Sequence, residues 1–227
     1  HVGQRAGALF EQITKDFLEK AFSLLNHLRP GEWEFFVASV YISRFEQYEH
    51  LATLSEFIQK QEELMATLGI DYIIKPDIVI GRRPVSDGVI NQHRIVIEPE
   101  LPLAVYTPLR EHNRPSGTLI LHASISCKWT IRSDRAQNTR TEALNLIRNR
   151  KGHTPHIVAV TAEPLPTRIA SLALGTGDID CVYHFALSEL QIAIEESGNQ
   201  DQADMLYTLI NGRRLRDISD LPFDLAI

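Results

Sequence analysis

Four side chains in this sequence have the chemistry to act on a charged ester, and they come from separate stretches of the chain: Asp77, Ser126, Lys128 and Glu142. Carboxylate oxygens are the ligands that Mg²⁺ prefers. A lysine ammonium beside a metal can stabilise negative charge that develops on phosphoryl oxygens. Together these residue types predict metal-assisted hydrolysis of a phosphodiester, with Asp77 and Glu142 as the metal ligands.

Lys128 ends an apolar run, 119–128, whose length and β-branched content predict a strand that is at least partly buried. Alternate residues of a strand share a face, so Ser126 and Lys128 point the same way. A buried ammonium is costly without compensation, and a carboxylate, a phosphate or the water shell of a metal could each provide it. The lysine therefore indicates a charged site at the end of this strand.

Asp77 follows Pro76 in a second predicted strand, 72–81, and Glu142 lies one turn into a predicted helix, 138–150. If the two strands are neighbours, all four side chains can converge at one end of a sheet.

The remaining elements predict an α/β fold in which helices flank a central mixed sheet. Apolar residues at three- and four-residue steps predict helices over 6–28, 33–48 and 51–68, so the first third is helical. Further elements are expected as strands at 94–97, 156–161 and 181–185 and as helices at 166–174, 188–196 and 201–210, before an irregular basic tail. The order strand, helix, strand over 119–161 predicts a parallel pair. We expect one domain over 1–227, with a helical third, 1–70, packed on a sheet core, 71–227.

Charge is unevenly distributed in this chain of 227 residues and net charge -6. Residues 128–151 carry seven basic and two acidic side chains, whereas residues 1–70 carry six basic and ten acidic ones. A basic centre on an acidic body is expected when one cleft alone meets phosphate. The two cysteines, Cys127 and Cys181, have no metal-ligand spacing, which favours a reducing cytoplasm. No apolar run has the length of a membrane span.

The motifs Pro76-Asp77, Ser126-Cys127-Lys128 and Glu142 after thirteen intervening residues resemble the rearranged signature of PD-(D/E)xK restriction endonucleases that cut around a CCGG core. In the usual form an acidic residue stands two positions before the lysine, whereas here that position is Ser126. The stretch 128–135, with its Arg-Ser-Asp-Arg ending, is most similar to NgoMIV-like type II enzymes. The resemblance extends over most of the chain.

This resemblance implies that Asp77, Lys128 and Glu142 form the active site, with Ser126 beside them and Glu11 as a further acidic neighbour. It also implies Mg²⁺, double-stranded DNA as substrate, the site GCCGGC, and a bacterial homotetramer that holds two DNA duplexes.

Base reading is expected from the residues that follow the strand. Arginine donates in a fork to guanine O6 and N7, and aspartate accepts from cytosine N4, so Arg132, Asp134 and Arg135 suit a core of G·C pairs. By the resemblance, Arg168 would contact the outer G·C pair and Gln4 the minor groove.

Each of these residues also has an ordinary structural interpretation. Lys128 could be a solvated strand end, and Asp77 a turn or cap residue. Glu142 could be a first-turn glutamate in a helix capped by Asn138 or Thr139. Glu11 could be a solvated helix residue. The Arg132, Asp134 and Arg135 cluster could be a surface salt-bridge group of little energetic weight.

Two other functions remain open from the sequence. A structure-selective repair or recombination nuclease of the same fold would cut without a preferred sequence. A DNA-binding module would bind without cutting, although the intact set of Asp77, Lys128 and Glu142 argues against it.

Overall fold

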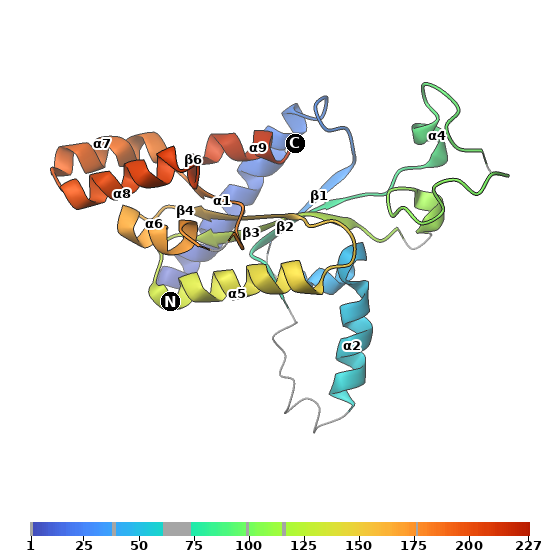
Figure 1. The fold of residues 1–227 in the computed structure, drawn as a ribbon, viewed down its shortest axis with the longest axis horizontal. Helices are drawn as coiled ribbons and strands as arrows, with labels where there is room; N and C mark the ends of the chain where they lie inside the picture. The colour runs from blue at the N-terminus through green and yellow to red at the C-terminus, as the bar shows by residue number, and fades with distance from the viewer. Residues whose placement is uncertain (1, 38–39, 61–73, 99, 115–116, 176) are drawn as a thin grey trace.

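The computed structural model describes residues 2–37, 40–60, 74–98, 100–114, 117–175 and 177–227, arranged around a central β-sheet (Figure 1). For residues 2, 59 and 133–135 it describes the backbone alone. Within these ranges the sheet has six strands in chain order, β1 to β6. The first two pairings, β1 with β2 and β2 with β3, are antiparallel, and the remaining three are parallel. The strands are β1 Trp33–Val37, β2 Ile78–Arg82, β3 Ile120–Lys128, β4 His156–Thr161, β5 Cys181–His184 and β6 Leu215–Asp217.

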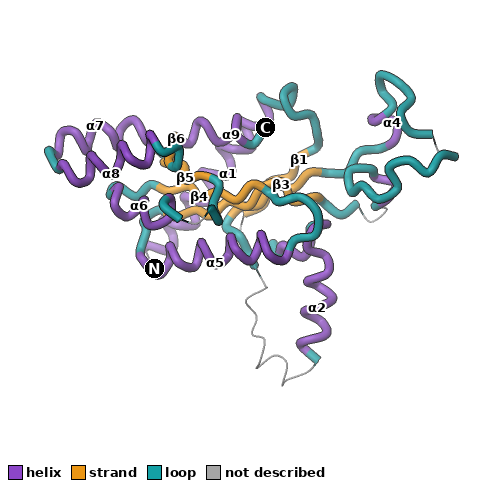
Figure 2. Tube along the Cα trace, viewed as in Figure 1, coloured by secondary structure: helices purple, strands orange, loops and turns teal. Residues whose placement is uncertain are grey.

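Helices cover both faces of this mixed sheet (Figure 2). The α-helices in the described ranges are α1 Val2–Leu24, α2 Glu49–Gln59, α4 Asp87–Ile90, α5 Ser133–Asn149, α6 Pro166–Ala173, α7 Leu187–Ser197, α8 Gln200–Asn211 and α9 Leu221–Asp224. Short 3-10 helices are η1 Ile42–Arg44, η2 Glu46–Tyr48, η3 Glu111–Asn113 and η4 Ile218–Asp220.

The alternation of side chains along β2 divides the interior into two cores. Ile78 and Ile80 point to the face covered by α1 and α9, where they pack with Phe10 and Leu221. Val79 points to the opposite face, which is covered by α2, α5, α6, α7 and α8. Both faces of the sheet are therefore buried, which is why β2 and β3 read as nearly continuous apolar runs.

The predicted fold class, a mixed sheet flanked by helices, is confirmed. The expected parallel pair is β3 and β4, in which Ala123 is the partner of His156. Predicted helices over 6–28, 138–150, 166–174, 188–196 and 201–210 correspond to α1, α5, α6, α7 and α8, and the strand at 181–185 to β5. The expected helix over 51–68 begins as α2, and its second half lies outside the described residues. Of the strand expected over 72–81, residues 78–81 form part of β2.

Three predictions are wrong. The helix expected over 33–48 is replaced, in the described part of that range, by β1, η1 and η2, because Trp33–Val37 pair with β2 along their whole length. Residues 94–97 are not a strand, because the Asn91 side chain accepts hydrogen bonds from the N–H groups of Val96 and Ile97 and satisfies them locally. The tail is not irregular, since β6 adds to β5 and is followed by η4 and α9.

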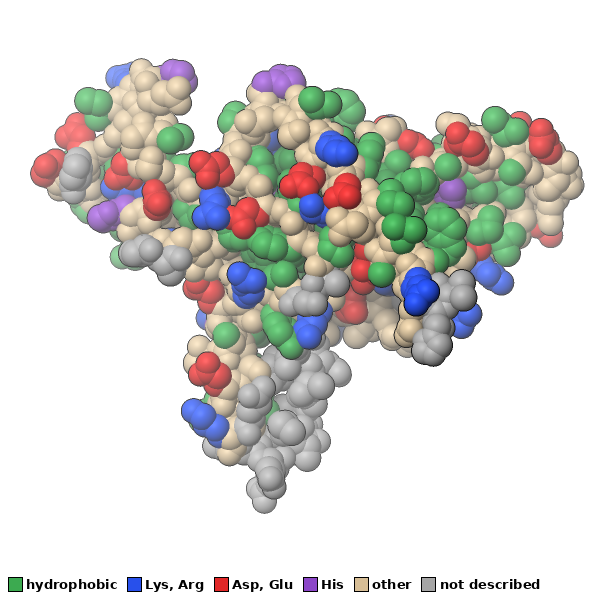
Figure 3. All heavy atoms as spheres, turned by 180° about the vertical axis from the view of Figure 1, so that it is seen from behind, with side chains coloured by type: hydrophobic (Ala, Val, Ile, Leu, Met, Phe, Trp, Pro, Cys, Tyr) green, Lys and Arg blue, Asp and Glu red, His purple; other side chains and the backbone are tan. Residues whose placement is uncertain are grey.

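The surface seen in Figure 3 carries acidic and basic side chains interspersed with one another, so that face has no continuous basic surface. Within the described ranges, no helix combines the length and the apolarity that crossing a bilayer requires.

Candidate active site

Asp77 meets Lys128 because β2 begins where its antiparallel neighbour β3 ends. Ile78 is paired with Ile125, which places Asp77 opposite the last residues of β3. Asp77 Oδ2 accepts a hydrogen bond from Lys128 Nζ at 2.7 Å and from the backbone N–H of Cys127 at 2.8 Å. The Ser126 hydroxyl donates to the same oxygen at 3.4 Å. The two strands are therefore neighbours, the condition on which convergence of the site residues depended, and Asp77 is the anionic partner of Lys128.

The Asp77–Lys128 pair is partly shielded from water. The side chains are 27% and 18% exposed, respectively. Ion pairs in such surroundings are less screened than surface pairs, so the ammonium is held in one position. The neighbouring Cys127 contributes its backbone N–H, whereas its side chain packs in the core with Phe10, and burial raises the pKa of its thiol well above the ordinary value.

Helix α5 brings Glu142 to the same place. The helix begins at Ser133, so Glu142 lies in its middle, and neither Asn138 nor Thr139 is a cap. Thr139 is on the same face as Glu142, one turn earlier, and its hydroxyl lies 3.3 Å from Ser126 Oγ. This hydrogen bond ties α5 to the end of β3.

The charges of Asp77 and Lys128 affect the pKa values of both Glu142 and Glu11. Burial raises the pKa of Glu142, the Asp77 carboxylate raises it further, and the Lys128 ammonium opposes both effects. Burial likewise raises the pKa of Glu11, followed by the Asp77 carboxylate, again against Lys128. Both side chains line a hollow of about 320 Å³ together with Lys128 and Arg132. The structure thus brings three acidic side chains into the field of one lysine.

This arrangement fits a hard divalent cation bound with the help of the substrate. Among the described residues, no three His, Cys, Asp or Glu side chains are close enough to form a complete protein cage for a metal. Mg²⁺ is typically bound by one or two carboxylates, with waters and substrate phosphates in the other positions. Asp77 and Glu142 are two carboxylates that could supply such a pair. Burial is the main cause of the raised pKa of Glu142, and a cation bound beside this carboxylate would favour its charged form.

The residues expected to read bases differ in how closely the structure places them to the hollow. Arg132 is exposed, precedes α5 and lines the hollow. Gln4 is exposed on α1, between Gly3 and Gly7, which line the same hollow. Arg168 lies in the first turn of α6, and its side chain is 56% exposed. The backbone of Asp134 and Arg135 forms the start of α5, and their side chains lie outside what the structure describes.

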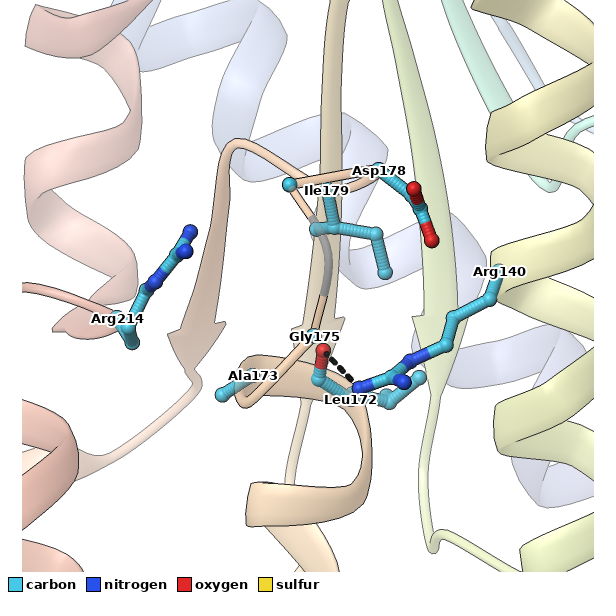
Figure 4. Close-up of a pocket in the computed structure, with 8 residues that line it drawn as sticks. Arg140, Leu172, Ala173, Gly175, Asp178, Ile179 and Arg214 are labelled. Atoms are coloured by element: carbon cyan, nitrogen blue, oxygen red, sulfur yellow. Dashed lines mark hydrogen bonds between the residues drawn. The ribbon is translucent and has the colours of Figure 1, made fainter.

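Helix α6, which carries Arg168, is fastened to α5 by Arg140 (Figure 4). The Arg140 guanidinium donates to the carbonyl oxygen of Leu174 at 2.5 Å and lies 3.4 Å from that of Leu172. These are carbonyls at the end of α6, which lack partners within the helix. A Cβ at Gly175 would come within 2.7 Å of the same guanidinium, so the arginine would have to shift if any other residue stood there.

Sequence reasoning missed Glu163, whose side chain is completely buried at 0% exposure. It follows β4 by two residues and accepts hydrogen bonds from the N–H groups of Ile131 and Leu165. The available signal was its position, since the carboxyl ends of the parallel strands β3 and β4 meet at one edge of the sheet.

Comparison with known proteins places the chain in a family. The family model described as NgoMIV restriction enzyme matches residues 1–227. The type II restriction enzyme NgoMIV of Neisseria gonorrhoeae is 50% identical over 229 residues, covering 99% of this chain and 79% of that enzyme. The chain belongs to the NgoMIV restriction enzyme family, the type II restriction endonuclease class that the sequence resembles.

Two solved structures are more distantly similar. The restriction endonuclease Bse634I with cognate DNA has a TM-score of 0.47 and 13% identity, over 86% of this chain and 75% of that one. The PspGI–substrate DNA complex has a TM-score of 0.29 and 19% identity, over 52% of this chain and 44% of that one.

Proposed function

We propose that this protein is a Mg²⁺-dependent type II restriction endonuclease that hydrolyses phosphodiester bonds of double-stranded DNA at a CCGG-core site, GCCGGC. The observation that carries the proposal is the 2.7 Å contact between Asp77 Oδ2 and Lys128 Nζ, together with the hollow that Lys128 and Glu142 both line. A carboxylate pair and an oriented ammonium are the groups that cleavage of a phosphodiester requires.

Asp77 and Glu142 would hold the Mg²⁺, with Ser126 hydrogen-bonded to Asp77 and Glu11 as an outer acidic neighbour. Bound Mg²⁺ would lower the pKa of a coordinated water and neutralise charge on the scissile phosphate. Asp77 has a second task, because the oxygen that accepts from Lys128 also accepts from the backbone of Cys127. This double contact fixes the direction of the carboxylate and of the ammonium.

Lys128 would stabilise the negative charge that grows on the phosphoryl oxygens as water attacks in line. Its ammonium has three N–H donors, of which Asp77 engages one, so others can reach a phosphate or the attacking water. Because the group is held in place before substrate binds, little reorganisation is needed in the transition state.

Sequence recognition would come from the residues around the hollow. Arg132, Asp134 and Arg135 would read the G·C pairs of the core in the major groove, Arg168 the outer pair, and Gln4 the minor groove. Arg132 supports this proposal because it is exposed and lines the same hollow as Lys128. Recognition and cleavage would then use adjoining surfaces.

We further propose, from the family resemblance, that residues 1–227 form one domain, that four copies assemble and hold two duplexes, and that the enzyme acts in the bacterial cytoplasm. Two cysteines, Cys127 and Cys181, are both free and buried, as expected in a reducing compartment. Light scattering of the purified protein with and without a GCCGGC duplex would measure the assembly.

Digestion of a fully sequenced plasmid with Mg²⁺, followed by mapping of the fragment ends, tests the proposed activity. We expect discrete fragments that end within GCCGGC, and no product when the cation is chelated. Random fragments would instead indicate a nuclease without a sequence preference, and intact plasmid would indicate a binding module.

The matched variants are Lys128→Ala and Lys15→Ala. Both lysine side chains are 18% exposed and paired with a carboxylate, but Lys15 pairs with Glu19 on the same helix. Lys128→Ala should abolish cutting while Lys15→Ala retains it. Cutting by Lys128→Ala at the wild-type rate would refute the assignment of the site.

A further inference from the structure

The carboxylate of Glu163 connects two parts of the chain that carry proposed base-reading residues. Its Oε2 accepts from the Ile131 N–H at 2.7 Å, and Ile131 is the neighbour of Arg132 in the connection from β3 to α5. Its Oε1 accepts from the Leu165 N–H at 3.2 Å, directly before α6. The two oxygens of one side chain thus link the approach to α5 with the approach to α6.

Glu163 also contacts Arg168 itself. Arg168 Nη1 lies 3.8 Å from Oε1, the oxygen that accepts from Leu165. The arginine side chain is 56% exposed while that of Glu163 is 0% exposed, so the contact joins a buried carboxylate to the guanidinium of a largely exposed arginine. One carboxylate therefore contacts both the backbone at the start of α6 and the guanidinium of the arginine that α6 carries.

The same network reaches the catalytic strand. The Glu163 N–H donates to Thr161 Oγ1 at 3.1 Å, and that hydroxyl donates to the carbonyl oxygen of Lys128 at 2.7 Å. The carbonyl oxygen of Glu163 lies 3.2 Å from His184 Nε2. The backbone of Glu163 is thus held on β3 and β5, so its side chain acts as a fixed reference for the two approaches.

Using a buried carboxylate to hold two loops together has a large desolvation cost. Removing a carboxylate from water is unfavourable, and a packed apolar group in its place often gives a protein that is equally stable. A carboxylate does offer two acceptors at a fixed separation, which an apolar group cannot. Two fixed acceptors make geometric sense where two elements must keep a set distance.

We propose that Glu163 is a positioning residue for site recognition, one that sets the spacing between Arg132 and Arg168 and thereby the discrimination at the outer base pair. The inference rests on the proposed function, because it takes both arginines to be base readers. Glu163 itself touches neither DNA nor metal; it acts through the residues that it holds.

Glu163→Gln is the informative substitution. The amide has the same shape but one acceptor oxygen, so one of the two N–H groups would face an NH₂ group instead. Glu163→Asp keeps both acceptors and retracts them by one methylene. Asp217→Asn is the matched control, because Asp217 also accepts from the N–H at the start of a helix, that of Leu187 in α7, but is not linked to a proposed base reader.

The experiment measures single-turnover cleavage with Mg²⁺ of duplexes that carry GCCGGC, an altered outer pair or an altered inner pair. Binding of the same duplexes is measured by fluorescence anisotropy with Ca²⁺ in place of Mg²⁺. We expect Glu163→Gln and Glu163→Asp to lower the ratio of cognate to outer-pair-variant rates by about tenfold, the weight of one displaced bidentate contact. Asp217→Asn should leave the ratio unchanged, and the binding ratio should change with the cleavage ratio.

A second comparison tests whether Glu163 acts through Arg168. In an Arg168→Ala background, Glu163→Gln should lower outer-pair discrimination by less than it does alone, because the group that it positions is gone.

An unchanged cognate ratio in a folded Glu163→Gln enzyme would overturn the inference and leave the proposed function intact. Loss of folding in both Glu163 variants would assign the residue to stability and would also overturn it. A wild-type enzyme that does not prefer GCCGGC would overturn the proposed function, and this inference with it.

Discussion

Lys128 and Asp77 lie 51 residues apart in the chain, yet Nζ and Oδ2 are 2.7 Å apart in the structure. Each group provides the opposite charge that the other requires. The ammonium is only 18% exposed and needs an anion, and the carboxylate stands beside two further acidic side chains and needs a cation. The pair is therefore a stable resting arrangement of the two groups that we propose act on a phosphate.

Two different substitutions of Asp77 should distinguish its contribution to the cleavage rate from its contribution to the free energy of unfolding. Asp77→Asn keeps an acceptor for the Cys127 N–H but removes a metal ligand, so we expect single-turnover cleavage to fall by at least about 10²-fold. Asp77→Ala also leaves the Lys128 ammonium without its partner, which should lower the free energy of unfolding by about 1–3 kcal/mol. Quenched-flow cleavage and urea denaturation measure the two effects. Cleavage by Asp77→Asn at the wild-type rate would contradict the assigned role.

Substitution of Thr139 should weaken metal binding and leave the position of Lys128 unchanged. Thr139→Val removes the hydroxyl that lies 3.3 Å from Ser126 Oγ and so loosens α5, which carries Glu142, from β3. We expect a higher apparent Kd for Mg²⁺, by about 3–10-fold for the loss of one hydrogen bond. The control is Thr141→Val, an exposed threonine on the same helix whose hydroxyl donates to the Gln137 carbonyl oxygen. Isothermal titration with Mn²⁺ measures binding directly, and equal affinities in the two variants would refute the expectation.

Much of this site was predictable because its members are marked by local sequence. Lys128 stands out as a charge at the end of an apolar strand, and the spacing to Glu142 identifies the helix that returns along the sheet. The sequence left open whether the strands of Asp77 and Lys128 are neighbours, and the antiparallel pairing of β2 and β3 in the structure brings Asp77 to the end of β3.

The residues that were missed depend on contacts between distant segments. Trp33, Phe36 and Val37 are spaced as in a helix, and pairing with β2 decides that they form a strand. Strand β6 has three residues, too few for a period, and exists because β5 offers an edge. In the sequence Glu163 resembles an ordinary loop glutamate, and only the folded structure shows that the N–H groups of Ile131 and Leu165 donate to it. Tertiary pairing overrides local pattern in each case.

His122 should make the protein sensitive to acid. Burial lowers the pKa of His122 to about 3, against 6.5 in the unfolded chain. Between these values the folded state binds fewer protons than the unfolded state, so stability is complete above about pH 6.5 and is lost as the pH falls towards 3. His122→Asn should reduce the slope of unfolding free energy against pH by up to about 1.4 kcal/mol per pH unit in this window. The exposed His27→Asn should leave the slope unchanged, and an unchanged slope in His122→Asn would contradict the argument.

Glu142 should make cleavage depend on both pH and Mg²⁺. Burial raises its pKa above 4.5, so the folded metal-free protein binds an extra proton from pH 4.5 up to the raised value, and ionising Glu142 lowers stability as the pH rises through that window. A metal needs the carboxylate, so Mg²⁺ and the proton compete for it. The acid limb of the single-turnover rate should therefore shift to lower pH as Mg²⁺ is increased.

The same competition predicts the behaviour of Glu142→Gln. Without Mg²⁺ at neutral pH this variant should unfold at higher urea concentration than the wild type, because no buried charge has to form, and the difference should vanish as the pH falls to 4.5. Glu56→Gln, at an exposed position in the middle of α2, should show neither effect. A Glu142→Gln protein that is less stable than the wild type at neutral pH, together with an acid limb that does not respond to Mg²⁺, would mean that Glu142 supports the fold and does not hold the metal.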